Sequence, residues 1–269
     1  MSAEESTASA SKKQVIADAL ALAGSPSAED HAELLARLES PAFLAQLDDE
    51  TAYRGRPERL RLRRVLDALA RNPAGSAQNV LVALTGSRAF LEEDARIDLL
   101  IKASATIVPP PDKVVRFWDA HWRPDDGFSN LTAAAVVQNG HEAAISLLEK
   151  KMANPQFEPD EKIHWMHGPM LSHRLDLPLL EGCKRMLETG LPDDLNGKLV
   201  ETLFDYRPQE WYLPSVPYTP PALETAEKAA LVELRGIARM ALEKFRLDER
   251  LTAQVKKVLE KVEALLDGA

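Results

Sequence analysis

The chain has 269 residues, 45% hydrophobic and 28% charged, so it can bury a core and is not a disordered sequence. Its formal net charge of −9 at pH 7 argues against generic binding to nucleic acid or to an anionic membrane, although a local basic patch can override this average. Twelve glycines and few runs rich in Val, Ile or Thr argue against a large β-sheet, whereas the Leu, Ala, Glu and Arg content favours helices. We therefore predict an all-α protein.

The single cysteine, Cys183, excludes an internal disulfide and is typical of a reducing compartment. It shares helical spacing with four apolar residues, so we expect a core residue rather than a nucleophile; these are Leu179, Leu180, Met186 and Leu187. The sequence does not show the basic residues followed by an apolar segment that are typical of a signal peptide. No uninterrupted apolar segment approaches the roughly twenty residues of a membrane-spanning helix. We expect a cytoplasmic protein without a signal peptide or a membrane partner.

The first fifty residues predict a tail followed by short helices. Residues 1–12 are too polar to offset the entropy of ordering, so we expect a disordered tail. Residues 15–23 form a short apolar helical pattern, and Ser27 with Asp30 resembles a capping box for the next helix. A loop is expected over residues 41–47.

Helical patterns then recur in pairs. One helix runs from Pro57 to about Arg71, and a pair follows over residues 78–84 and from Arg88 or Asp94 to Ile107. Asp112 is expected to cap a helix over residues 113–122.

Residues 127–174 show the pairing most clearly, because Asn139-Gly140 separates two apolar helical patterns and a third apolar run begins at Ile163. The second helices of five successive units align at spacings of 35, 33, 33 and 36 residues; the aligned positions are Arg61, Arg96, Ser129, Lys162 and Lys198. A near-constant spacing of this size indicates a helical solenoid rather than a bundle.

The segment from Asn139 to Lys150 resembles the turn and helix of HEAT-like repeats, in which a Gly-polar-Glu-Ala turn leads into an apolar helix. The resemblance extends loosely over residues 27–206. It implies a right-handed α-solenoid of HEAT-like helical pairs, which we assign to residues 13–206. Members of this family mostly serve as scaffolds and binding surfaces. The Trp-Leu-Gly-Tyr pattern of tetratricopeptide repeats does not fit these units.

The composition changes after Tyr206. Five prolines fall within residues 207–221, so this segment is expected to be an extended strap, rich in aromatic rings, that packs on the last repeat. Residues 222–269 carry two longer helical patterns, the second capped by Asp248, and are predicted to form a helical hairpin that caps the stack.

Aromatic residues are the first candidates for binding. Trp118 and Trp122 lie four residues apart, and core packing is the favoured role for such rings; the functional alternative is an aromatic wall in a groove. The candidate binding residues are Trp118, Trp122, Trp165, Trp211 and Tyr212, the last two bordering a partner groove.

An arginine run between Arg54 and Arg71 is the densest cluster of charge. HEAT-like DNA glycosylases grip phosphates with basic residues on their concave face, so this run offers an alternative function in nucleic-acid binding or repair. The possible phosphate contacts are Arg59, Arg61, Arg63 and Arg64. On a helix these arginines spread around most of the polar circumference, and a solvated surface explains them adequately.

His164 and His167 share a helix face and raise the possibility of a metal-dependent enzyme. No carboxylate accompanies them at the spacing of zinc hydrolases. The di-iron deoxyhypusine hydroxylases place His-Glu pairs on successive HEAT repeats, whereas this chain has only His141-Glu142. We therefore expect no catalytic residue, no metal and no cofactor. The predicted function is non-catalytic binding of a protein or peptide on the concave surface, with no indication of partner identity or oligomeric state.

Overall fold

The computed structural model describes residues 3–47, 61–124, 127–205 and 222–268, with side chains from Lys13 onward and without that of residue 193. These residues form fourteen α-helices and three short 3₁₀ or π segments, with no strand among them, so the all-α prediction is confirmed. Within the same ranges, no helix combines the length and apolarity needed to cross a membrane. Packing divides the chain into two compact units, Met1–Ala120 and His121–Ala269, where we had predicted one array.

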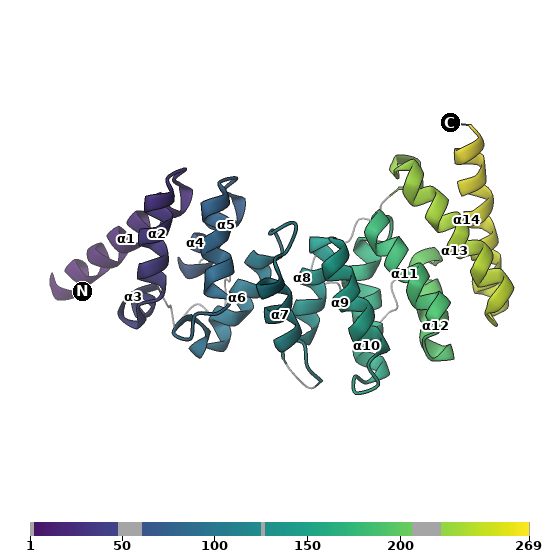
Figure 1. Cartoon of the computed structure of the whole chain (residues 1–269), viewed down its shortest axis with the longest axis horizontal. Coiled ribbons are helices and arrows are strands. Elements are labelled where there is room, and N and C mark those ends of the chain that lie inside the picture. Colours follow the sequence, from purple (N-terminus) through teal and green to yellow (C-terminus); the bar gives the residue numbers. More distant parts are fainter. Residues whose placement is uncertain (1–2, 48–60, 125–126, 206–221, 269) are drawn as a thin grey trace. The chain divides into compact units, whose positions relative to one another are not determined.

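Unit 1 contains seven α-helices (Figure 1): α1 Ala3–Gly24, α2 Ala28–Leu38, α3 Pro41–Leu47, α4 Arg61–Arg71, α5 Gly75–Leu84, α6 Asp94–Ser104 and α7 Asp112–Ala120, with a 3₁₀ turn, η3, at Phe90–Glu92. Five of them pack in two rows, α1, α4 and α6 in one and α2 and α5 in the other, because α1 lies on α4, α4 on α6 and α2 on α5. Apolar stripes at helical spacing fill the space between the rows, including Leu34 and Leu38 of α2 and Leu66 and Leu69 of α4.

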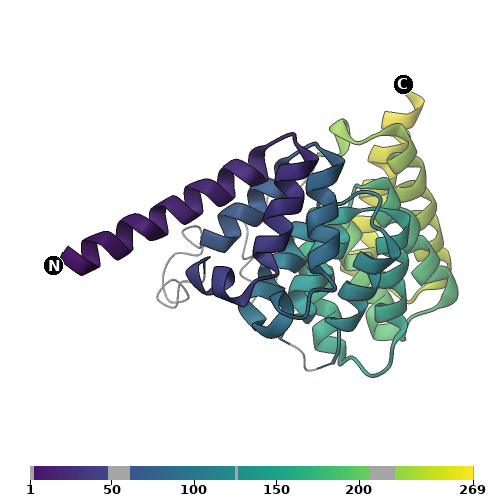
Figure 2. The same cartoon turned by 60° about the vertical axis from the view of Figure 1, so that its left-hand side comes forward.

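Two expectations for unit 1 are wrong. Residues 3–12 belong to α1 rather than to a disordered tail, since Ala and Glu propagate a helix well from its packed C-terminal half. The N-terminal part of α1 extends past the other helices of unit 1 (Figures 1 and 2). Residues 41–47 form α3 instead of a loop. Pro41 supplies a helical φ at the first position, and the Ser40 carbonyl accepts from the amides of Phe43 and Leu44 at 3.1 and 3.0 Å.

Unit 2 contains the remaining helices (Figure 1): α8 Ser129–Asn139, α9 Glu142–Ala153, α10 Pro159–Trp165, α11 Leu177–Thr189, α12 Asp193–Phe204, α13 Lys228–Lys244 and α14 Glu249–Asp267. A π-helical turn, η4 at Met166–Met170, continues α10, and a 3₁₀ turn, η5 at Leu223–Thr225, precedes α13. One row consists of α8, α10 with η4, α12 and α14, and the other of α9, α11 and α13. Each helix packs on the next member of its row.

Local sequence explains the ends of these helices. Gly140 closes α8 in the left-handed conformation, with φ 66°, and His141 begins α9 by accepting the Ala143 amide on Nδ1 at 3.3 Å. Pro169 has no N–H to donate, and the helix widens there into the π turn. In unit 1, the Ser27 hydroxyl accepts the Asp30 amide at 3.3 Å, as the capping pattern predicts.

The two C-terminal helices are present as expected. Asp248 caps α14 by accepting the Leu251 amide at 2.6 Å, and α14 packs along α13 through its apolar stripe; the buried members are Leu251, Val255, Val258 and Val262. Helix α13 begins at Lys228, several residues later than the prediction. Residues 206–221, which include the predicted strap with Trp211 and Tyr212, lie outside the described part, so that prediction stays untested.

Candidate functional site

The structure assigns three of the predicted binding tryptophans to the core. Trp118, Trp122 and Trp165 are fully buried. Trp118 belongs to unit 1, where its indole N–H donates to the Ser104 hydroxyl at 2.9 Å. Fully buried rings cannot contact a partner at the surface, so the core interpretation holds for these residues and the aromatic-wall alternative does not.

In unit 2, the rings of Trp122 and Phe157 contact a buried ammonium group, that of Lys151, and Trp165 packs on both rings. The Lys151 Nζ lies 6.0 Å from the centre of the Trp122 ring and 5.7 Å from that of Phe157. It also donates a hydrogen bond to the backbone carbonyl of Trp122 at 2.5 Å. Rings attract a cation over their faces through their quadrupole, and the attraction strengthens where water is excluded. We call Trp122, Phe157, Trp165 and Lys151 the ammonium cage.

The rings of the ammonium cage support one another directly. Trp165 lies 5.0 Å from Trp122 and 5.1 Å from Phe157, measured between ring centres, and both pairs are edge-to-face. The Trp165 indole N–H donates to the side-chain oxygen of Asn130 in α8 at 3.1 Å, which fixes the ring's orientation. By contrast, the buried Trp122 Nε1 has no hydrogen-bond partner. This part of the core therefore tolerates an unsatisfied donor next to a buried cation.

The sequence did not reveal Lys151. Lys150 and Lys151 both belong to the last turn of α9, where a basic side chain also favours the helix dipole. The structure exposes Lys150 and leaves Lys151 only 6% exposed. The signal that could have found it is its spacing of four and three residues from the buried Leu147 and Leu148, which places Lys151 on the apolar face of α9. The rings that surround the ammonium group come together only in the fold.

The described part of the chain contains three of the four predicted phosphate contacts, all in α4. Arg59 lies outside it. In α4, Arg61 donates to the Gln46 carbonyl at 3.4 Å, and Arg63 lies 3.6 Å from Asp67 in an i, i+4 ion pair. Arg64 is exposed. The three described arginines thus differ in exposure and in partners.

The two candidate metal ligands have different environments. His164 is exposed on α10, whereas His167 is 7% exposed within η4. Among the described residues, no three His, Cys, Asp or Glu side chains are grouped so that they could hold a metal ion. Burial lowers the pKa of His167, and the nearby charges of Lys198 and His164 act in the same direction, against the effect of Glu201. His167 is therefore suited to a neutral structural role.

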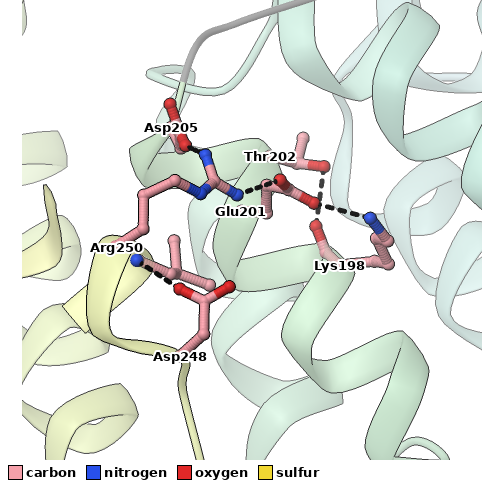
Figure 3. Close-up of polar contacts among 7 residues, drawn as sticks. Lys198, Glu201, Thr202, Asp205, Asp248 and Arg250 are labelled. Atoms are coloured by element: carbon pink, nitrogen blue, oxygen red, sulfur yellow. Dashed lines mark hydrogen bonds and ion pairs between the residues drawn. The ribbon is translucent and has the colours of Figure 1, made fainter. Parts of the chain in front are cut away.

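A charged cluster joins α12 to α14 in the same row (Figure 3). Arg250 of α14 donates to Glu201 at 2.7 Å and also binds Asp205, whose side chain is 4% exposed. Lys198 donates to the other oxygen of Glu201 at 2.8 Å. Burial works to raise the pKa of Glu201, but the hydrogen bonds from Lys198 and Arg250 outweigh it and hold the pKa below its usual value of 4.5. The cluster fixes the first turn of α14 on the C-terminal end of α12.

A hydroxyl and an imidazole also meet in unit 1, next to a shallow depression of about 220 Å³ between α2 and α5. Ser76 Oγ lies 2.6 Å from His31 Nδ1, and Asn72 Nδ2 lies 3.3 Å from His31 Nε2. Sequence reasoning missed this Ser–His–Asn arrangement because Asn72 is 41 residues from His31 along the chain.

The hydrogen bonds of Asn72 tie this arrangement into the packing of unit 1. Its amide nitrogen donates to the carbonyls of Ala23 and Ser25 at 2.9 and 2.7 Å, and its oxygen accepts the Ala74 amide at 3.0 Å. These two donations use both hydrogens of the amino group. Asn72 therefore joins the α4–α5 connection to the end of α1 and the residue that follows it, while the Ser76–His31 contact links α5 to α2.

Cys183 is fully buried in α11, as the sequence predicts. Burial raises the pKa of its thiol far above the usual range, and the nearby Glu149 carboxylate adds to this effect. A neutral, inaccessible thiol is a poor nucleophile.

Comparisons with protein-family models, with curated proteins and with solved structures find no match to this chain.

Proposed function

We propose that this chain is a helical-repeat scaffold, a right-handed α-solenoid of HEAT-like pairs, that binds a protein or peptide without catalysing a reaction. The observation that carries the proposal is the two-row packing within each unit, in which each helix contacts the next member of its own row. Such packing produces long faces whose side chains come from successive helices, which is how repeat proteins present a continuous binding surface.

The position of the five aligned residues supports the repeat interpretation. Arg61 and Arg96 lie in α4 and α6, and Ser129, Lys162 and Lys198 lie in α8, α10 and α12. Within each unit these positions therefore share one row, that of α4 and α6 in unit 1 and that of α8, α10 and α12 in unit 2. A spacing near 34 residues is what a stack of two-helix units requires.

Charged pairs between successive helices of the other row support the same proposal. Arg185 of α11 binds Glu149 of α9 through two nitrogens, with contacts of 2.7 to 3.2 Å. Lys184 of α11 donates to Glu233 of α13 at 2.8 Å. Arg185 thus links α11 to α9, and Lys184 links α11 to α13. The α9–α11–α13 row is therefore joined by ion pairs as well as by apolar contacts.

The test is affinity capture from a lysate of the source cell, with one charge-changing variant in each row of unit 2. His164→Glu changes an exposed residue of α10, and Glu181→Lys changes an exposed residue of α11. We expect one protein to be enriched by the native chain and lost with only one of the two variants. Circular dichroism must show that both variants remain helical.

The alternative function, nucleic-acid binding through Arg59, Arg61, Arg63 and Arg64, predicts a different result. A mobility-shift titration at physiological salt should then show micromolar binding that weakens steeply as salt rises. Such binding, together with no protein enriched in the capture experiment, would replace the scaffold proposal.

A further inference from the structure

The ammonium cage has the features of a built cation site. Every side chain in it is at least nine-tenths buried, with exposed fractions of 0% for Trp122 and Trp165, 2% for Phe157 and 6% for Lys151. The Trp122 carbonyl supplies a hydrogen-bond acceptor at 2.5 Å from the ammonium nitrogen, and two ring faces supply the attraction for its charge. Acceptor and rings thus contact the same cation.

The walls of the cage are positioned by groups other than Lys151. Trp165 ends α10 and is held by Asn130 of α8, while Phe157 lies in the α9–α10 connection, where its amide donates to the Asn154 carbonyl at 3.4 Å. The ring-to-ring contacts of Trp165 with Trp122 and Phe157 do not involve the ammonium group. Shortening Lys151 should therefore remove the cation and its stem while the walls remain.

We propose that Trp122, Phe157 and Trp165 form an ammonium-binding site that the native chain fills with its own Lys151, and that takes a free primary alkylammonium ion when this side chain is shortened. A primary ammonium is preferred because it carries the N–H that the Trp122 carbonyl accepts. A quaternary ammonium of similar charge satisfies the rings but leaves this buried carbonyl without its donor.

The experiment is thermal unfolding of Lys151→Ala with n-propylammonium chloride, followed by circular dichroism at constant ionic strength. Alanine keeps the Cβ atom, so the n-propyl chain replaces the three methylenes that the substitution removes. We expect a saturable rise in Tm of roughly 3 °C or more once the ion is well above its Kd. Tetramethylammonium should give a smaller rise. The native chain and Lys150→Ala, which alters the exposed neighbour on α9, should show none.

Two results would overturn the proposal. If n-propanol raises the Tm of Lys151→Ala as much as n-propylammonium does, the space is an apolar cavity and not an ammonium site. If n-propylammonium leaves the Tm of the folded variant unchanged, no such site exists.

If Lys151→Ala does not fold, a second comparison tests whether the Phe157 ring interacts with the charge of Lys151. Lys151→Met keeps the length of the side chain but removes its charge, and it is measured both in the native chain and together with Phe157→Leu. If the ring binds the ammonium group, the loss of Tm caused by Lys151→Met is smaller when Phe157 is replaced. Equal losses in the two backgrounds would show that ring and charge do not interact.

Discussion

Gly182 of α11 lies directly against Ile145 of α9, with no room for a side chain between the two helices. A Cβ atom at Gly182 would come closer than 3.0 Å to the Ile145 Cγ2 and to 3.2 Å from a carboxylate oxygen of Glu149. Ile145 is fully buried and cannot easily move aside. The close approach also lets Arg185 of α11 reach Glu149 for its two-nitrogen contact.

Gly182→Ala should therefore destabilise unit 2, although alanine is a better helix former than glycine by about 1 kcal/mol. Overpacking a buried contact costs about 1–3 kcal/mol, so after the helix-propensity gain we expect a net loss of up to about 2 kcal/mol in the free energy of unfolding. Urea denaturation followed by circular dichroism measures it. Gly236→Ala in α13 is the matched control, because only the Lys184 Nζ, at 4.0 Å, lies near the added atom. This control should be neutral or stabilising, and a similar loss in both variants would contradict the explanation.

Arg250→Ala should loosen the attachment of α14 to α12. The guanidinium bridges Glu201 and Asp205, and its removal leaves two carboxylates close together, one of them 4% exposed. Hydrogen bonds to charged groups contribute about 1.5–3 kcal/mol, and we expect a loss near the lower end because the Arg250 side chain is 46% exposed. Hydrogen exchange should become faster in the first turns of α14.

The control for Arg250 is Arg239→Ala. Arg239 contacts Glu263 of α14 from α13 at 2.6 Å, but the two side chains are 61% and 37% exposed. Exposed ion pairs contribute about 0.2–1 kcal/mol, so this variant should change stability by less than 1 kcal/mol. Equal losses for Arg250→Ala and Arg239→Ala would show that burial of Asp205 does not matter.

Cys183 should resist thiol reagents in the native protein. Its burial in α11 and the raised pKa of the thiol both oppose formation of an accessible thiolate. Mixing with an aromatic disulfide reagent at pH 8 should give a slow reaction that accelerates strongly in denaturing urea. A rapid reaction of the folded protein without urea would show that α11 opens readily or that the thiol is not buried.

Local signals made much of the secondary structure predictable. Ser27, Gly140 and Asp248 are helix-end residues whose roles depend only on the next few residues, and each acts as its sequence suggests. The helical spacing of Leu251 with Val255 likewise identifies the buried stripe of α14.

The candidate site depends on contacts that no local pattern contains. Periodicity places Lys151 on the buried face of α9, three and four residues after Leu148 and Leu147, but it does not indicate what surrounds the ammonium group. Only the packing of Trp122 and Phe157 does so. The Asn72–His31 contact likewise joins residues that lie 41 positions apart, so the sequence around either residue does not predict it. Sequence reasoning therefore identified tryptophans worth examining but not the cation among them.

His167 makes the stability of unit 2 depend on pH in a defined window. Burial holds the pKa of His167 below its ordinary value of 6.5, so the unfolded chain takes up a proton on this residue at a higher pH than the folded chain does. The free energy of unfolding contributed by this group should therefore fall as the pH drops through about 6.5. Glu201 acts at lower pH, because its lowered pKa makes its contribution disappear only below 4.5.

The prediction is tested by urea denaturation of the native chain and of His167→Gln at several pH values between about 7.5 and 5.5, a range around the ordinary histidine pKa. The charged groups that act on His167 from its surroundings are Lys198 and Glu201 of α12 and His164 of α10, whereas α8, which also packs on η4, contains no charged residue. His164→Gln is the control, since His164 is exposed. The loss of stability on acidification should be smaller in His167→Gln and nearly unchanged in His164→Gln. If His167→Gln loses as much stability as the native chain over this range, burial of the neutral imidazole does not set the pH dependence.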